Sequence, residues 1–234
     1  MTYDGSKYGF FYYWILVAIL NPKESQKKQF NQYNRHPISS FLCIFIVNMV
    51  YPEVIHGMFV DLRSITLDDA EFSYNIRADK RNRDTVGQLA PSLEAQKDFI
   101  RWQMQEPNDY YFVVLNKKGE RIGLIGAYDL QGDMIEVGRE VNMGEPTEIM
   151  EAEILIDDFC KNVLNVKRTC GVVYSNNTRK LNEVNKRAKF IKMVQRGGRD
   201  AMYFEHDLYS ENSTELKIRQ LLKRLYVRKK LTAD

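Results

Sequence analysis

The pattern of hydrophobic and polar residues changes character near residue 57. Beyond it, short runs rich in aromatic and β-branched residues alternate with turn residues, which is typical of strands. Apolar residues at steps of three and four predict helices between them. The predicted strands are residues 59–65, 110–115, 121–130, 134–142, 168–174, 189–195 and 201–208, and the predicted helices lie near residues 68–76, 92–104, 147–163, 177–187 and 216–226. An antiparallel meander followed by a β-α-β unit predicts an α/β fold with a mixed sheet.

The first part of the chain has two apolar clusters, residues 10–20 and 41–50, separated by a polar and basic stretch. Each is roughly half the length of about 20 apolar residues that a spanning helix needs. Three interpretations stay open: a membrane-surface anchor, an extra packing or oligomerisation element, or an upstream start that places the native N-terminus at Met58. We adopt the third. The predicted organisation is an atypical extension at 1–57, a domain at 58–210, and a C-terminal helix and tail at 211–234.

Composition excludes few classes of function. The 234 residues are 44% hydrophobic and 28% charged, with a formal net charge of +3, which is ordinary for a globular protein and too mild to indicate nucleic acid. The three cysteines show no disulfide or CxxC spacing and favour a reduced, cytoplasmic setting. The three histidines form no cluster in the sequence, so no metal site is expected. The basic C-terminal helix is interpreted as a solvated face.

Five consecutive segments carry a family resemblance. They are Ile122-Gly-Leu-Ile-Gly-Ala-Tyr-Asp129, Ile135-Glu-Val-Gly-Arg139, the helical run 147–163, Arg168-Thr-Cys-Gly-Val-Val-Tyr174 and Asn185-Lys-Arg-Ala-Lys-Phe-Ile191. In order and spacing they resemble the acyl-CoA core of the GNAT superfamily of N-acetyltransferases. The resemblance implies a splayed, mostly antiparallel central sheet flanked by helices, with acetyl-CoA as cosubstrate and no metal.

The resemblance also implies where acetyl-CoA would bind. In the superfamily, the pantetheine amides bond to the exposed backbone of the fourth strand, and the pyrophosphate rests on amides at the start of the next helix, where the helix dipole favours an anion. Here these elements are the strand 135–142 and the helix that begins near Thr147. The residues that would contact acetyl-CoA are Val141, Asn142, Met143, Gly144, Thr147, Glu148 and Asn177.

Two motifs depart from the family pattern. The pyrophosphate loop has one glycine, Gly144, no arginine, and three acids nearby at Glu145, Glu148 and Glu151. Either backbone amides alone hold the ligand, or the domain is a non-catalytic scaffold. Asn185 occupies the position of the family's tyrosine, so it could donate a hydrogen bond to the sulfur of the leaving group but could not act as a general acid.

Glu136 is the candidate general base, because direct attack on a thioester requires a neutral amine and a base must take a proton from the ammonium. It aligns with a glutamate that many GNAT enzymes carry on this strand. The two-residue period predicts that Glu136, Gly138 and Glu140 share one face. The alternative is a strand glutamate that faces the surface.

The acceptor is indicated only by resemblance. Arg77, Tyr128 and Arg139 resemble positions in the amino-sugar acetyltransferases, in which the acceptor is often an amine on a nucleotide-linked sugar. Acetylation of a protein N-terminus or a ribosomal protein is the alternative. The expected partner is thus a small-molecule amine and not nucleic acid; a homodimer is compatible with the pattern. Membrane contact is expected only if residues 1–57 belong to the protein and act as an anchor.

Overall fold

The computed structural model describes residues 50–210 and 213–232. The chain divides after Ile46, and all the described residues belong to the second unit, Val47–Asp234. The predicted apolar clusters at residues 10–20 and 41–50 therefore lie outside the described residues, apart from residue 50. Among the helices that are described, none combines the length and apolar content that crossing a membrane would require.

The described residues form one eight-stranded sheet with the order β1-β2-β3-β4-β5-β6-β8-β7. Neighbouring strands are antiparallel except β5 and β6, which are parallel. The strands are β1 (Ile55–His56), β2 (Val60–Ser64), β3 (Tyr110–Asn116), β4 (Arg121–Gln131), β5 (Met134–Asn142), β6 (Arg168–Tyr174), β7 (Lys189–Arg196) and β8 (Arg199–Asp207). The closing hairpin folds back so that its second strand, β8, pairs with β6 and leaves β7 at the edge.

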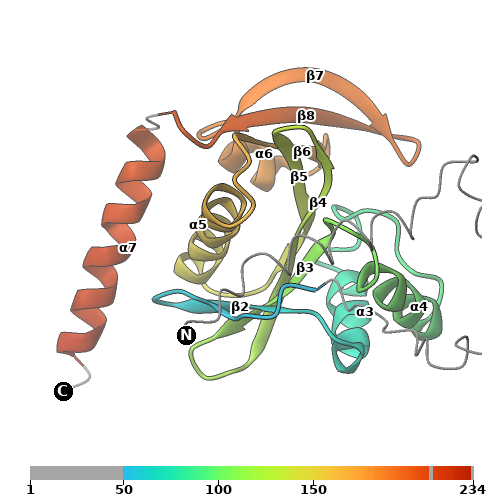
Figure 1. The fold of residues 1–234 in the computed structure, drawn as a ribbon, viewed down its shortest axis with the longest axis horizontal. Coiled ribbons are helices and arrows are strands. Elements are labelled where there is room, and N and C mark those ends of the chain that lie inside the picture. Colours follow the sequence, from blue (N-terminus) through green and yellow to red (C-terminus); the bar gives the residue numbers. More distant parts are fainter. Residues whose placement is uncertain (1–49, 211–212, 233–234) are drawn as a thin grey trace, which may run out of the picture. The chain divides into compact units, whose positions relative to one another are not determined.

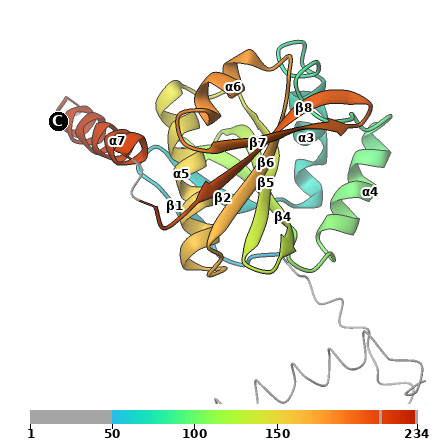
Figure 2. The ribbon, with the colours of Figure 1, turned by 90° about the horizontal axis from the view of Figure 1, so that it is seen from above.

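Helices cover both faces of the sheet (Figures 1 and 2). One face carries the 3-10 turn η1 (Leu67–Asp69), α3 (Ala70–Ala78) and α4 (Leu93–Gln103), and the other carries α5 (Pro146–Asn162), α6 (Thr178–Val184) and α7 (Ser213–Leu231). Each face has its own apolar core: one is built around Ile65, Ile100 and Leu124, the other around Phe112 and Phe159. The predicted mixed, mostly antiparallel sheet with a C-terminal helix is confirmed.

Residues before Met58 take part in this fold. Strand β1 pairs with β2, and the Tyr51 ring packs edge-on against Phe159 with a centroid distance of 5.0 Å. The carboxylate of Glu151 on α5 accepts hydrogen bonds from the backbone N–H groups of Met58 and Val60, at 2.8 and 2.9 Å, and also from that of residue 59. The packed unit therefore extends upstream of Met58, and a native start at Met58 stays a prediction that would remove β1 and Tyr51.

A β-bulge interrupts β5 in its second half. Leu124 of β4 pairs with Val141 and Gly126 pairs with Gly138, so one residue of β4 faces two residues of β5. Arg139 in this bulge has a φ of 52°. The extra residue reverses the alternation of side chains beyond it. The prediction that Glu136 and Glu140 share a face is therefore wrong, since the bulge turns Glu140 towards α5 and α6.

Candidate active site

The parallel strands β5 and β6 separate from each other after a short stretch of pairing. Their register runs only from Met134 opposite Arg168 to Glu136 opposite Cys170. Each strand keeps its antiparallel neighbour beyond that point, β4 on one side and β8 on the other. Residues 137–142 therefore present backbone N–H and C=O groups towards the gap without a strand to receive them there. Such an open edge can accept an extended, amide-bearing chain.

A cavity of about 540 Å³ lies at this divergence. It is lined by both strands, by α5 and α6, and by the loop that follows α3. The absence of a side chain at Gly171 on β6 keeps the space between the two strands open, because a Cβ atom there would lie 3.1 Å from the backbone oxygen of Val137 on β5. Any larger side chain at Gly171 would narrow the gap between the two strands.

Glu136 lies at the last paired position of β5, where the gap begins. Its buried carboxylate accepts a hydrogen bond from the Tyr128 hydroxyl at 2.7 Å and forms an ion pair with Arg196 of β7. Gly138 makes room for this contact, because a Cβ there would lie 2.5 Å from the Tyr128 oxygen. Burial raises the pKa of Tyr128, and the neighbouring Glu136 charge raises it further. Tyr128 therefore stays protonated and donates a hydrogen bond to the carboxylate.

Arg139 holds the bulge in place. Its guanidinium donates to both carboxylate oxygens of Asp109, at 2.6 and 2.8 Å, and stacks on the Tyr128 ring at 3.9 Å. It also lies over the rings of Phe99 and Tyr111, at 5.2 and 5.7 Å from their centroids. A bidentate ion pair and three ring contacts offset the cost of its left-handed backbone, roughly 1–2 kcal/mol for a residue with a side chain.

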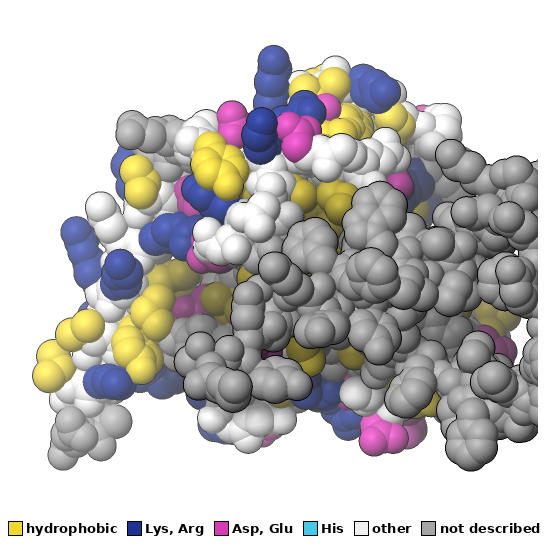
Figure 3. Space-filling model, in the orientation of Figure 1, with side chains coloured by type: hydrophobic (Ala, Val, Ile, Leu, Met, Phe, Trp, Pro, Cys, Tyr) yellow, Lys and Arg dark blue, Asp and Glu magenta, His cyan; other side chains and the backbone are white. Residues whose placement is uncertain are grey.

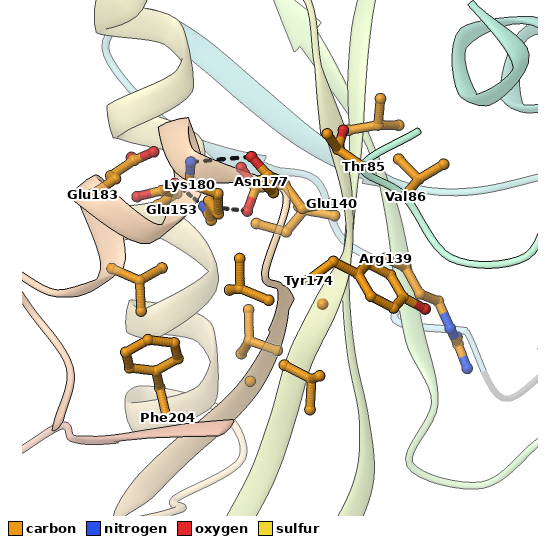
Figure 4. Close-up of a pocket in the computed structure, with 18 of the residues that line it drawn as sticks. Thr85, Val86, Arg139, Glu140, Glu153, Tyr174, Asn177, Lys180, Glu183 and Phe204 are labelled. Carbon is orange, nitrogen blue, oxygen red and sulfur yellow. Dashed lines mark hydrogen bonds and ion pairs between the residues drawn. The ribbon is translucent and has the colours of Figure 1, made fainter. Parts of the chain in front are cut away.

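On the opposite face of the sheet, Lys180 joins three elements across the cavity (Figure 4). Its ammonium group lies 2.5 Å from a carboxylate oxygen of Glu140 on β5 and forms a second ion pair with Glu153 on α5. Burial alone would lower the pKa of Lys180, but the surrounding carboxylates outweigh it and raise the pKa. Burial alone would raise the pKa of Glu153, whereas Lys180 and Arg187 lower it to about 2. Lys180 and Glu153 are therefore both charged.

Two further residues complete this cluster. Arg187, after α6, lies 3.4 Å from Glu153 and 3.4 Å from Asp157, so it adds a second connection between α6 and α5. Glu183 on α6 also lines the cavity. Burial raises the pKa of Glu183 to about 7, because the attraction of Lys180 does not cancel the desolvation and the repulsion of the other carboxylates.

Glu183 predicts a pH dependence of stability. The pKa of Glu183 in the folded protein, about 7, lies above its ordinary value of 4.5. Its contribution to the free energy of unfolding is therefore fully present below about pH 4.5 and is lost as the pH rises through 7. Glu183→Gln should remove this step and stabilise the protein by about 1–2 kcal/mol at alkaline pH, a value reduced for partial exposure. Urea unfolding at about pH 5 and about pH 8 measures it. An unchanged pH dependence in the variant would exclude Glu183 as its source.

The start of α5 is capped by its own side chains. The backbone N–H of Glu145 donates to the Glu148 carboxylate at 2.8 Å, and that of Gly144 donates to the Asn142 side chain at 2.9 Å. Pro146, the first residue of the helix, has no N–H group. The Glu148 carboxylate and the Asn142 amide oxygen thus already accept hydrogen bonds from backbone N–H groups that could otherwise bind a phosphate.

The structure brings most, but not all, of the predicted site residues to the cavity. Asn177 is the N-cap of α6, and its side chain accepts from the Lys180 backbone N–H at 3.1 Å. Asn185 is the exposed C-cap of α6 and is outside the cavity lining. The predicted residues that line the cavity are Arg77, Tyr128, Glu136, Arg139, Val141, Asn142 and Asn177, and those outside its lining are Met143, Gly144, Thr147, Glu148 and Asn185.

Sequence reasoning missed the cluster around Lys180, although the chain carries a signal for it. Glu153 and Asp157 lie four residues apart on the apolar stripe of α5, where acids are rare unless they are paired. Lys180 and Arg187 lie seven residues apart, two helical turns, and so were candidates for a matching pair of cations. Arg196, which contacts Glu136, gave no such signal because it lies on a separate hairpin.

The cavity fits one end of acetyl-CoA better than the other. The open backbone of β5 and the absence of a side chain at Gly171 suit a pantetheine chain. The exposed Arg179 on α6 also lines the cavity, and it is a cation that could contact a pyrophosphate in place of a loop arginine. Residues 137–142, Asn177 and Arg179 are the groups in this cavity that could hold such a cosubstrate.

Comparisons with known proteins agree with this geometry. Residues 60–186 match the family model described as "Acetyltransferase (GNAT) domain". A GCN5-related N-acetyltransferase from Brucella melitensis is 13% identical with a TM-score of 0.63, over 74% of this chain and 86% of that one. A nucleotide-linked sugar GNAT, FdhC in its apo form, is 16% identical with a TM-score of 0.59, over 71% and 97%.

A protein from Vibrio cholerae assigned as a ribosomal-protein-serine acetyltransferase is 18% identical with a TM-score of 0.58, over 68% and 99% of the two chains. No curated protein matches the sequence significantly. At these identities the solved structures show the fold, while the family model covers more than half of the chain. The chain therefore belongs to the GNAT acetyltransferases, the acetyl-CoA-dependent N-acetyltransferases.

Proposed function

We propose that the protein transfers an acetyl group to a primary amine at the point where β5 and β6 separate, with Glu136 as the general base. Acetyl-CoA supplies the acetyl thioester. The observation that carries the proposal is the position of Glu136, a buried carboxylate at the last paired residue of β5 and in the cavity lining. Arg196 pairs with this carboxylate and Tyr128 donates a hydrogen bond to it, and a water molecule or the ammonium itself would deliver the proton.

The backbone amides near Val141 are proposed to polarise the thioester carbonyl, because they belong to the part of β5 that does not pair with β6. Asn185 is proposed to hydrogen-bond the leaving sulfur only if the segment after α6 moves, because the residue is exposed outside the cavity. Thiolate leaves readily without full protonation, because the pKa of a free thiol is only about 8.5.

The acceptor is proposed to be an amine on a nucleotide-linked sugar. Arg77 lines the cavity, and its one hydrogen bond in the described structure is a long 3.4 Å contact to the Gln88 carbonyl, so its charge is available for a phosphate. Arg139 is already paired with Asp109 and would act on the acceptor through its stacking on Tyr128. The similarity to a nucleotide-linked sugar GNAT supports this acceptor, and that to a ribosomal-protein enzyme supports the peptide alternative.

Release of free thiol from acetyl-CoA, followed for a panel of amines, tests the proposal. A nucleotide-linked amino sugar should be acetylated faster than the free amino sugar, and Arg77→Ala should remove most of the difference. If a peptide N-terminus were acetylated faster than the nucleotide-linked amino sugar, the acceptor would be a protein and not a sugar. A cytoplasmic location and a homodimer stay predictions.

A non-catalytic domain is the second candidate, favoured by the capped start of α5. Glu148→Ala should then be informative: it removes a carboxylate from the pyrophosphate end and frees the N–H of Glu145. We expect acetyl-CoA to bind the variant about three- to tenfold more tightly, as one removed like charge is worth about 1 kcal/mol. Isothermal titration measures this, with Glu71→Gln on α3, outside the cavity, as the control.

An unchanged affinity in Glu148→Ala would mean that the phosphates do not approach α5. Absence of binding in both variants and in the wild-type protein would favour the non-catalytic domain.

A further inference from the structure

Helix α7 lies outside the matched family domain, residues 60–186, and is attached by one face to the face of the sheet that carries α5. Leu222 is buried in the core, and the Tyr226 ring packs edge-on against Phe59 at 5.9 Å. Arg219 donates to both oxygens of Asp158 on α5, at 2.8 and 2.7 Å. These contacts fix which face of α7 is turned outward.

The outward face carries an apolar stripe. Leu216, Val227 and Leu231 are exposed by 53%, 57% and 75%. With 3.6 residues per turn, these three side chains and the exposed Gln220 fall within an arc of about 60° around the helix axis. Three exposed aliphatic side chains therefore share one side of the helix, and Leu221, 44% exposed, lies beyond this arc.

Cations border this stripe on both sides. The exposed Lys223 and Lys230 lie on one side, and the exposed Lys217, Arg224 and Arg228 lie on the other. Figure 3 shows Lys, Arg and hydrophobic side chains together along α7. The single acid within Ser213–Leu231 is Glu215, which pairs with Arg219 on the inward side at 2.7 Å. The outward face of α7 thus has five positive charges and no carboxylate of its own.

We propose that this face of α7 binds the surface of a membrane that contains anionic lipids. An apolar stripe flanked by lysine and arginine lets aliphatic side chains enter the interface while the cations contact lipid phosphates. Helix α7 would then lie flat on the membrane with the sheet above it. A nucleic-acid surface would use the five cations but would leave the aliphatic stripe without a partner, and the tyrosine of α7 faces inward, away from any base.

Co-sedimentation of the full chain with vesicles tests this proposal. The protein should sediment with vesicles of phosphatidylcholine and phosphatidylglycerol but not with phosphatidylcholine alone. Two variants separate the contributions: Lys223→Glu/Arg224→Glu/Arg228→Glu removes the charge, and Leu216→Ser/Val227→Ser/Leu231→Ser removes the stripe. Each should lower the partition coefficient at least about tenfold. The matched control reverses three exposed lysines elsewhere, Lys80→Glu/Lys118→Glu/Lys189→Glu, and should bind like the wild type.

All the changed side chains are exposed, and an unfolding curve of each variant is to be measured to check that it is folded. Equal binding of the charge variant and the wild type would overturn the proposal and place the contact elsewhere in the chain. If the protein bound a model RNA but not vesicles, and the serine variant bound that RNA as well as the wild type, the partner of this face would be nucleic acid instead of a membrane.

Discussion

Lys180→Met is expected to lower the free energy of unfolding by about 3 kcal/mol. The substitution keeps an unbranched side chain but leaves Glu140 and Glu153 facing each other without their shared cation. Breaking a buried ion pair costs about 3–5 kcal/mol, because one charge stays buried without compensation. The lower end applies here, since the Lys180 and Glu140 side chains keep 22% and 19% of their exposure. Urea unfolding near neutral pH measures the loss.

Two further variants make this result specific. Lys97→Met removes an exposed pair with Glu94 on α4 and should cost less than about 1 kcal/mol. Combining Lys180→Met with Glu140→Gln and Glu153→Gln removes the uncompensated charges and should restore most of the lost stability. A triple variant as unstable as Lys180→Met would show that packing, not charge, holds α6 against α5.

Glu136→Gln is expected to lower kcat/KM about 100-fold or more, with the Kd for acetyl-CoA unchanged within about twofold. Glutamine keeps the size of the side chain and can still accept a hydrogen bond from Tyr128, but it cannot take a proton. Steady-state rates from thiol release and titration with acetyl-CoA measure the two quantities separately.

The pH profile distinguishes a base from a residue that only positions Arg196. If Glu136 removes the proton, the defect should shrink as the pH approaches the pKa of the acceptor amine, because the amine then becomes neutral without help. A defect of the same size at every pH would assign Glu136 to the support of Arg196 and the hairpin β7–β8.

Much of the fold could be predicted from local patterns. The strand at Met134–Asn142 and the strand at Arg168–Tyr174 are found at the predicted residues, because alternation and β-branched runs mark them directly. The bulge at Arg139 could not be predicted, since it depends on pairing with β4 and on Asp109, 30 residues earlier in the chain. Because of this bulge, the side chains of Glu136 and Glu140 lie on opposite faces of the sheet.

The part of the candidate site that lies on strand β5 could be predicted from the sequence. Glu136 and Val141 line the cavity as expected because their strand does. The ion pairs of Lys180 and Arg196 depend on how α6 and the β7–β8 hairpin lie against β5, which no short-range pattern encodes. Asn185 was placed by alignment with a family motif, but α6 ends at Val184 and turns that side chain outward.

We expect acetyl-CoA to bind in the gap between β5 and β6. Isothermal titration of acetyl-CoA into the wild-type protein and into Gly171→Val tests it most directly, because a side chain at Gly171 would meet the Val137 carbonyl across the gap. The wild type should bind one equivalent, and folded Gly171→Val should bind at least about tenfold more weakly, because the valine side chain and the ligand would compete for the same space in the gap. No binding by the wild type, or equal binding by the two proteins, would contradict it.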